Sequence, residues 1–292
     1  MISLDNLTFN YNPGKHLSPP AVDAVNAEIG PGIFLLAGEN GSGKTTLMHI
    51  IDGLLRPTSG SCLIDGADTS RRLPSTLGKV FFLPDNFECP FATIGELGER
   101  HGAFYPRFDT GMLRENLHAF GLETDSRLKS LSLGMRRKAY AAYALALGTE
   151  ILLLDEPTNG MDISAKRELR RMIGRCTAPE STVIVSTHTI DDLRSLYDAL
   201  IVMHRGRMLL SMPLDVLSSR LAFVSGFEPH PDALYQEPSL GVFRALVPND
   251  GTIETDVDFG LLYMGLLSPS RQKIINQLNC IPEYKEYKDH DN

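Results

Sequence analysis

The chain has 292 residues, enough for one large domain and a smaller appendage. Hydrophobic residues make up 42% of it and charged residues 22%, as in ordinary globular proteins, and the formal net charge is −8. This negative balance argues against a surface for nucleic acid, which needs clustered Lys and Arg, so no nucleic-acid partner is expected.

Targeting and membrane segments are not evident in the sequence. The start, Met-Ile-Ser-Leu-Asp-Asn, lacks the basic and apolar regions of a signal peptide. No apolar run approaches the roughly 20 residues that a membrane-spanning helix requires. The four cysteines lie far apart, which predicts neither a disulfide framework nor a zinc site. We therefore expect a cytoplasmic protein, held at the inner face of the cell membrane only through another subunit.

The N-terminal part of the chain predicts a strand, a loop and a helix. Residues 2–11 alternate between apolar and polar in the manner of a strand, and a Gly/Pro/Asn-rich turn follows at 12–15. A short apolar run at 33–37 ends at Gly38. A glycine-rich loop comes next, and residues 45–54 have the pattern of a helix.

Two further runs are apolar on both faces, at 151–154 and 182–185, and each ends next to polar residues. Such runs are typical of buried parallel strands. Helical patterns lie at 93–104, 109–120 and 135–147. Strands alternating with helices predict an α/β sheet whose chemistry lies at the carboxyl ends of the strands.

The character of the sequence changes after Met212. The stretch 213–292 is rich in Pro and contains short strand-like pieces such as 242–247. We interpret it as a small accessory domain that follows a main domain of residues 1–212. The helical stretch at about 86–135 predicts a helical subdomain inserted into the main domain.

One segment matches the pattern G-x-x-x-x-G-K-[ST], namely Gly38-Glu-Asn-Gly-Ser-Gly-Lys44-Thr45. Its glycines let backbone N–H groups curl around a phosphate, and the helix that follows presents its positive N-terminus. Lys44 would then reach the β- and γ-phosphates, and the Thr45 hydroxyl would ligate Mg²⁺. The strand before this loop and the helix after it are the context that the pattern requires.

The apolar run at 151–154 ends in two carboxylates, Asp155 and Glu156. Alternating side-chain directions would let one hold Mg²⁺ through water while the other polarises the attacking water. An isolated acidic pair after a strand is more often a solvated loop or a helix cap. Its place downstream of a phosphate loop favours the catalytic interpretation.

Further motifs give the chain a resemblance to the ABC ATPase family. Leu131-Ser-Leu-Gly-Met135 resembles the family signature Leu-Ser-Gly-Gly-Gln, about twenty residues before the Asp155 strand, where the family places it. Asn159-Gly-Met-Asp162 resembles the D-loop. His188 matches the switch histidine, and Tyr11 matches the aromatic residue that stacks on adenine. The motifs follow the family's order.

The resemblance covers residues 1 to 212 and implies an architecture. It implies an α/β fold, with a P-loop NTPase core around a parallel sheet, an N-terminal antiparallel β subdomain and an inserted helical subdomain. The small C-terminal accessory domain, 213–292, would follow this nucleotide-binding domain.

The resemblance also implies residue roles, with ATP and Mg²⁺ as cofactors. The implied nucleotide-binding residues are Tyr11, Gly38, Asn40, Gly41, Ser42, Gly43, Lys44, Thr45, Thr46, Ser132, Gly134 and Asp162. Thr45 and Asp155 would serve Mg²⁺. Glu156 would be the catalytic base, with His188 and Lys44 at the γ-phosphate. Ser132 begins a helix whose N-terminus would close over the ATP of a second subunit, so that each site is shared across a head-to-tail dimer.

Two departures from the family pattern stand out. Asp85 lies where the family has the Q-loop glutamine, and we expect a metal-linked role for it, the alternative being a turn residue after Pro84. Leu133 and Met135 replace Gly and Gln of the signature. Because Ser132 and Gly134 remain, closure on ATP is expected to survive. Both departures resemble those of ATPases that serve ABC-2-type permeases.

The function that follows as an expectation is a transport ATPase that drives an integral-membrane permease subunit, by export or an ABC-2-like process. Aromatic residues at 87–108 would line a groove for the permease, or would form the core of the helical subdomain. The alternative is a soluble ABC ATPase in a non-transport assembly, linked to cluster assembly or to nucleic acid. A catalytically dead regulator is a third hypothesis, against which the presence of Glu156 and His188 argues.

Overall fold

The structure, a computed structural model, describes residues 1–12, 19–187, 193 and 195–279. The chain divides into two compact units, Met1–Ser211 and Met212–Asn292, which are described in turn. This division lies one residue before the boundary expected from the sequence. Within the described residues no helix is long and apolar enough to cross a membrane.

An antiparallel sheet opens the first unit, in the order β2-β1-β4-β5 over the described residues. Its strands are β1 (Ile2–Phe9), β2 (Val22–Ile29), β4 (Ser59–Ile64) and β5 (Ala67–Asp68). Alternate residues of β1, including Ile2, Leu4 and Leu7, are buried, because side chains of a strand point to opposite faces in turn. The expected N-terminal antiparallel subdomain is therefore present, and its first strand ends two residues earlier than predicted.

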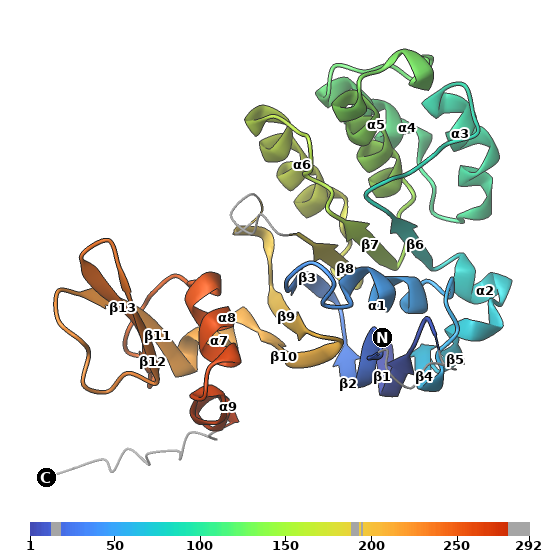
Figure 1. Cartoon of the computed structure of the whole chain (residues 1–292). Coiled ribbons are helices and arrows are strands. Elements are labelled where there is room, and N and C mark those ends of the chain that lie inside the picture. Colours follow the sequence, from blue (N-terminus) through green and yellow to red (C-terminus); the bar gives the residue numbers. More distant parts are fainter. Residues whose placement is uncertain (13–18, 188–192, 194, 280–292) are drawn as a thin grey trace, which may run out of the picture. The chain divides into compact units, whose positions relative to one another are not determined.

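The second sheet of this unit has the order β10-β9-β3-β8-β7-β6 over the described residues (Figure 1). Its strands are β3 (Gly32–Ala37), β6 (Val80–Leu83), β7 (Ile151–Asp155), β8 (Thr182–Ser186), β9 (Ala199–His204) and β10 (Arg207–Pro213). β3 pairs in parallel with β8 and β9, and β7 pairs in parallel with β6 and β8. Leu36 and Asp155 both pair with Ser186, so the ends of β3, β7 and β8 meet at one edge.

Four helices of the first unit agree with the predicted ones to within a few residues, whereas the helices at Pro74–Leu77 and Ile163–Cys176 were not predicted. The described helices of this unit are α1 (Lys44–Ile51), α2 (Pro74–Leu77), α3 (Ile94–Arg100), α4 (Thr110–Ala119), α5 (Leu133–Ala146) and α6 (Ile163–Cys176), with 3₁₀ turns η1 (Thr69–Arg71), η2 (Gly102–Phe104) and η3 (Leu128–Ser130). Four of the α-helices begin at side-chain caps, which is why the chain starts a helix at these points: Thr93, Asp109, Ser132 and Asp162 accept hydrogen bonds from first-turn N–H groups.

Two aromatic residues of the helical subdomain, Tyr105 and Phe108, pack against buried rings. Phe81 of β6 contacts Tyr105 and Tyr143 edge-on, with ring centroids 5.8 and 6.0 Å apart. Phe108 also packs against Tyr143, at 6.1 Å. Phe104 is different, because 76% of it is exposed. Edge-to-face pairs at these separations are a favourable aromatic arrangement. The core interpretation therefore holds for Tyr105 and Phe108.

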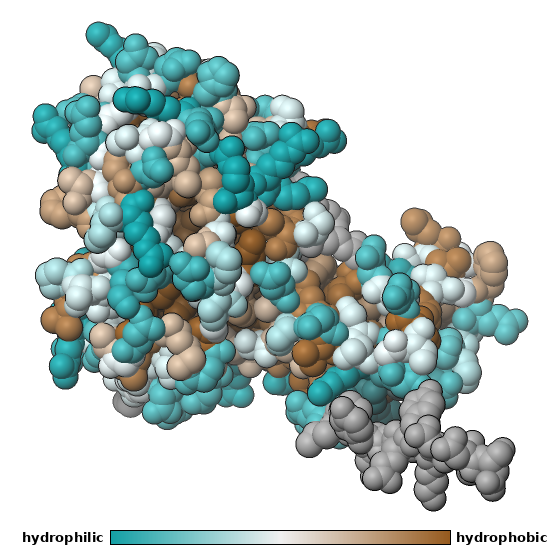
Figure 2. Space-filling view, turned by 180° about the vertical axis from the view of Figure 1, so that it is seen from behind, coloured by the Kyte–Doolittle hydropathy of each residue, from teal (hydrophilic) through white to brown (hydrophobic). Residues whose placement is uncertain are grey.

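The second unit has its own sheet, in the order β11-β13-β12, and three described helices. Its elements are α7 (Leu214–Arg220), β11 (Leu221–Gly226), β12 (Tyr235–Ser239), β13 (Val242–Pro248), α8 (Phe259–Leu267) and α9 (Arg271–Asn279). Buried Asn249 fastens its loops, because its amide donates to the carbonyls of Ser218 and Ile253. Hydrophobic residues also remain on its surface, among them Phe227 and Leu240, and brown patches interrupt the teal surface of this unit in Figure 2.

Candidate functional site

The predicted phosphate loop connects β3 to α1, and its shape requires glycine. Gly38 and Gly43 have φ angles of +151° and +103°. A Cβ atom would lie 2.3 Å from the Met203 carbonyl oxygen at Gly38 and 2.2 Å from the Ala21 carbonyl oxygen at Gly43. Any other residue would clash with the backbone. Gly43 provides no side-chain cap, so the first N–H groups of α1 face the loop, as phosphate binding requires.

Lys44 folds back over this loop. Its Nζ donates to the carbonyl oxygens of Gly38, at 2.7 Å, and Glu39, at 3.1 Å. The residue is 7% exposed. Burial lowers the pKa of Lys44, and the nearby carboxylates of Glu156 and Asp155 partly oppose that shift. A cation is thus held beside the loop, next to the two acidic residues that follow β7.

Asp155 and Thr45 lie together at the edge of the parallel sheet. The Thr45 hydroxyl donates to Asp155 Oδ2 at 2.8 Å, and the Ser186 hydroxyl donates to Asp155 Oδ1. Asp155 is 8% exposed. Burial lowers the pKa of His49 in α1, and the charge of Asp155 works against that shift. Asp155 is therefore oriented by two hydroxyl groups from different elements.

These oxygen donors fit Mg²⁺. A hydroxyl and a carboxylate are hard oxygen ligands, and Mg²⁺ usually takes only one or two such groups from protein, with phosphate and water completing the shell. No group of three or more His, Cys, Asp or Glu side chains in the described ranges could hold a metal by itself. The donor set at Thr45 and Asp155 suits an ion that arrives with a nucleotide.

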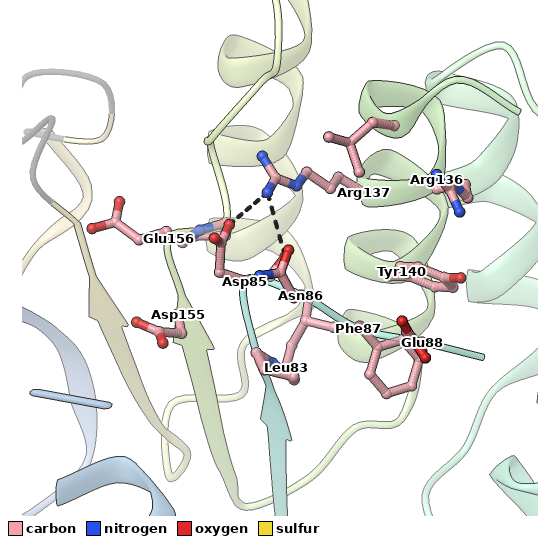
Figure 3. Close-up of a pocket in the computed structure, with 13 residues that line it drawn as sticks. Leu83, Asp85, Asn86, Phe87, Glu88, Arg136, Arg137, Tyr140, Asp155 and Glu156 are labelled. Atoms are coloured by element: carbon pink, nitrogen blue, oxygen red, sulfur yellow. Dashed lines mark hydrogen bonds and ion pairs between the residues drawn. The ribbon is translucent and has the colours of Figure 1, made fainter. Parts of the chain in front are cut away.

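Glu156 follows with a constrained backbone. Its φ angle is +50°, a left-handed conformation that is uncommon for residues other than glycine, and its N–H donates to the Ser186 carbonyl oxygen at 2.9 Å. This bond fixes the turn at the end of β7. Asp155 and Glu156 both line a cavity of about 330 Å³ together with Asp85 and Arg137 (Figure 3).

Tyr11 lies beside the start of α1, as a base-stacking residue must. Its hydroxyl and the Thr46 hydroxyl are 3.1 Å apart. Its ring meets Phe9 edge-on, with centroids 4.9 Å apart, and 58% of the residue is exposed. The ring is thus held at one edge while much of its surface faces solvent. Its contact with adenine stays a prediction.

The signature turn, residues 131–135, begins α5. The Ser132 hydroxyl accepts a hydrogen bond from the Met135 N–H at 3.2 Å and so caps the helix. Leu133 and Met135, which replace the family's Gly and Gln, are 56% and 39% exposed. Gly134 packs against the D-loop, residues 159–162, because a Cβ there would lie 2.9 Å from the Gly160 carbonyl oxygen.

Three predicted site residues remain. Two of them bind other residues of the chain, and the third lies outside the residues that the structure describes. The Asp85 carboxylate accepts hydrogen bonds from Arg137, at 2.7 Å, and Asn159, at 3.3 Å. Asp162 caps α6 through the Ala165 N–H and pairs with Lys138, and these bonds hold the pKa of its carboxyl well below the usual range. His188 lies outside the described residues. The Mg²⁺ role of Asp85 and the nucleotide contact of Asp162 stay predictions.

Sequence reasoning missed several residues of this site. Ser186 carries no motif signal, yet its register opposite Asp155 places its hydroxyl on that carboxylate. His49 and Arg137 carried no motif signal. His49 lies four residues after Thr45, on the same face of α1. Arg137 lies just after the signature turn, but its partner is 52 residues away in sequence.

Comparisons with known proteins agree with this geometry. The sequence model described as ABC transporter matches residues 22–159. The energy-coupling factor transporter ATP-binding protein EcfA2 of Symbiobacterium thermophilum is 34% identical over 228 residues, which cover 72% of this chain and 77% of that protein.

Two solved structures are similar in fold. A dimeric, post-hydrolysis ATP-binding cassette bound to ADP and phosphate has a TM-score of 0.61 and 27% identity, and the match covers 73% of this chain and 99% of that one. A candidate cobalt transport ATP-binding protein has a TM-score of 0.66 and 24% identity, covering 94% and 99%. The curated relative gives no support to the expected export or ABC-2-like process, and it does not favour the non-transport alternative.

Proposed function

The chain belongs to the family of ABC transporter ATP-binding proteins, and on this premise we propose that it is the Mg²⁺-dependent ATPase subunit of a transporter. The observation that carries the proposal is the Thr45–Asp155 hydrogen bond beside Lys44. It joins the phosphate loop to the acidic end of β7, which are the two elements that nucleotide hydrolysis needs in one place.

The chemistry follows from positioning and charge. Phosphoryl transfer to water needs little covalent help from the protein, so the site works by neutralising charge and orienting the nucleophile. Lys44 and the loop N–H groups would bind the β- and γ-phosphates. Glu156, fixed by its bond to the Ser186 carbonyl, would accept a proton from the attacking water. His188 would contact the γ-phosphate.

Thr45 and Asp155 would hold Mg²⁺. The ion supplies positive charge that offsets the charge of the phosphates. Within the chain, the Ser186 hydroxyl on Asp155 keeps that carboxylate aimed at Thr45.

We further propose that two ATPase subunits, identical or not, close head to tail on ATP and drive an integral-membrane permease. Support comes from the capped N-terminus of α5, whose Ser132 and Gly134 would meet the nucleotide of the opposite subunit. Further support comes from the dimeric cassette of similar fold and from the transporter named in the curated relative's description.

The test is whether the Glu156→Gln protein dimerises on binding ATP, measured by light scattering with and without Mg-ATP. The amide cannot accept a proton from water, so turnover should fall by at least about a hundredfold while ATP still binds. The ATP-bound dimer should then accumulate.

Two control variants test whether the dimerisation depends on ATP binding at this site. Lys44→Ala should lose ATP binding and dimerisation together. Glu180→Gln, which changes an exposed carboxylate away from the site, should behave as the parent protein does. Unchanged turnover in Glu156→Gln would rule out Glu156 as the base. A variant that binds ATP but stays monomeric would point to a non-identical partner.

A further inference from the structure

Three segments distant in sequence meet at the Asp85 carboxylate. Arg137 of α5 donates from one guanidinium nitrogen to Asp85 Oδ1 at 2.7 Å and from another to the Asn159 carbonyl oxygen at 2.6 Å. The Asn159 amide closes the triangle by donating to Asp85 Oδ1 at 3.3 Å. The segment that leaves β6, the first turns of α5 and the D-loop are thus joined by one set of polar contacts.

These contacts lie mostly out of water. The Arg137 side chain is 14% exposed and that of Asp85 33%. A partly buried arginine depends on its carboxylate, because removing one partner leaves a charge with little solvation, whereas an exposed pair contributes little. Asp85 is therefore the counter-charge that lets Arg137 sit at the wall of the cavity (Figure 3).

The signature turn and the D-loop are also fastened to each other directly. Lys138, next along α5, pairs with Asp162 at 2.8 Å. Gly134 lies against the Gly160 carbonyl so closely that a Cβ would be only 2.9 Å away. The start of α5 and the D-loop are therefore in direct contact. Asp85 ties this pair of segments to the end of β6.

The Asp85 carboxylate points toward Arg137. In Figure 3 the dashed contacts run from Arg137 to Asp85, whereas the carboxylates of Asp155 and Glu156 point away from Arg137. Asp155 is held instead by Thr45 and Ser186. The contacts of Asp85 thus belong to α5 and the D-loop.

We propose that Asp85 is a positioning residue which, through Arg137, fixes the signature turn and the D-loop relative to the catalytic edge of the sheet. It acts on the second subunit's nucleotide through Ser132 and Gly134, and on its own site through the D-loop. The inference rests on the proposed function, because the signature turn matters only if two subunits share their sites.

The test measures ATP-driven dimerisation of the Glu156→Gln protein with and without a further substitution. The further substitutions are Asp85→Ala, Asp85→Asn, Arg137→Ala and the double Asp85→Ala/Arg137→Ala. At saturating Mg-ATP, Asp85→Ala and Arg137→Ala should each raise the dimer dissociation constant roughly tenfold, the loss expected for one charged hydrogen-bonded pair. The double variant should lose less than the sum of the two single losses, because both single variants remove the Asp85–Arg137 contact. Affinity of the monomer for ATP should stay within about twofold.

Asp85→Asn guards against misfolding, because its amide oxygen still accepts from Arg137 and its size is unchanged. It should fall between parent and Asp85→Ala. The charge-reversed protein Asp85→Arg/Arg137→Asp should recover part of the loss. Asp65→Asn, which weakens a partly exposed ion pair with Lys79 at the turn after β4, is the control and should leave dimerisation unchanged.

Metal dependence separates this role from direct ligation of Mg²⁺. With Glu156 intact, the Mg²⁺ concentration for half-maximal turnover should be unchanged in both Asp85→Asn and Arg137→Ala. A rise in Asp85→Asn alone, with Arg137→Ala dimerising as the parent does, would overturn the positioning role in favour of ligation. Additive losses would overturn it as well. If the parent neither hydrolyses ATP nor dimerises with it, the proposed function fails first and this inference fails with it.

Discussion

At the scale of single residues, Asp52 stands out as a carboxyl whose pKa is raised by burial and only partly lowered by a neighbouring charge. It lies at the C-terminal end of α1, where helix carbonyls disfavour negative charge. Burial raises the pKa of Asp52 to about 7, and the Arg72 charge only partly opposes this. The folded protein therefore holds a proton there that the unfolded chain, with a pKa near 4, releases.

We predict that Asp52→Asn stabilises the protein at neutral pH. Since the folded pKa is the raised one, the stability that Asp52 contributes is present below about pH 4 and is lost as pH rises to about 7. The free energy of unfolding of the variant should exceed that of the parent increasingly across this window and level off above it. Urea unfolding at several pH values measures this.

Asp125→Asn, at an exposed position, is the control for that experiment. A constant difference between Asp52→Asn and the parent from pH 4 to 8 would contradict the raised pKa.

At the scale of elements, α5 has two roles: it packs inside the helical subdomain, and it carries the signature turn at its start. Its middle and end, residues 139–146, are buried, whereas Leu133 and Met135 at its start are exposed. The helix is therefore anchored at one end by burial and at the other by polar contacts with the D-loop. Small changes at that second end should alter function more than stability.

We predict that Gly134→Ala weakens ATP-driven dimerisation of the Glu156→Gln protein several-fold. The added Cβ would lie 2.9 Å from the Gly160 carbonyl oxygen, so α5 and the D-loop must separate. Gly95→Ala is a closely matched control, because its Cβ would meet the Thr124 carbonyl oxygen at the same 2.9 Å in the first turn of α3. Equal effects of the two on dimerisation would show that only general strain is involved.

Element prediction from sequence succeeded where the pattern is local. The apolar sequence runs of β3, β7 and β8 predicted parallel strands, and the side chains of these strands are buried on both faces. The strand β6 has four residues, and β2 mixes Asn, Asp and Glu with apolar residues, so neither was predicted. Both owe their conformation to pairing with β7 and β1, and such pairing is not visible in a short sequence window.

At the scale of the whole chain, the two units have separate hydrophobic cores. One cluster joins β1, β3, β7 and α1 of the first unit, among them Leu36 and Leu47. The other lies within the second unit and includes Ala222, Ala245 and Val247. Separate cores allow a substitution in one unit to leave the other intact.

We predict that Leu246→Ala, in β13 of the second unit, lowers stability by about 2–5 kcal/mol but leaves ATP affinity within about twofold. Leu36→Ala is the matched variant: it is equally buried, lies in β3 next to the phosphate loop, and should lower ATP affinity as well. Calorimetry and a fluorescent ATP analogue measure the two quantities. Loss of ATP affinity in Leu246→Ala would contradict the separation of the cores.

The sequence by itself predicted the phosphate loop and the acidic strand end, because each is a short local motif: glycines that alone tolerate the loop, with Lys44 and Thr45 after them, and two carboxylates ending a strand. What only the tertiary structure decided are contacts between residues far apart in the chain. The Ser186 hydroxyl on Asp155 and the Arg137 guanidinium on Asp85 exist because parallel strands align their ends and α5 lies beside them. Those side chains carry no motif, so their role follows from their place in the fold.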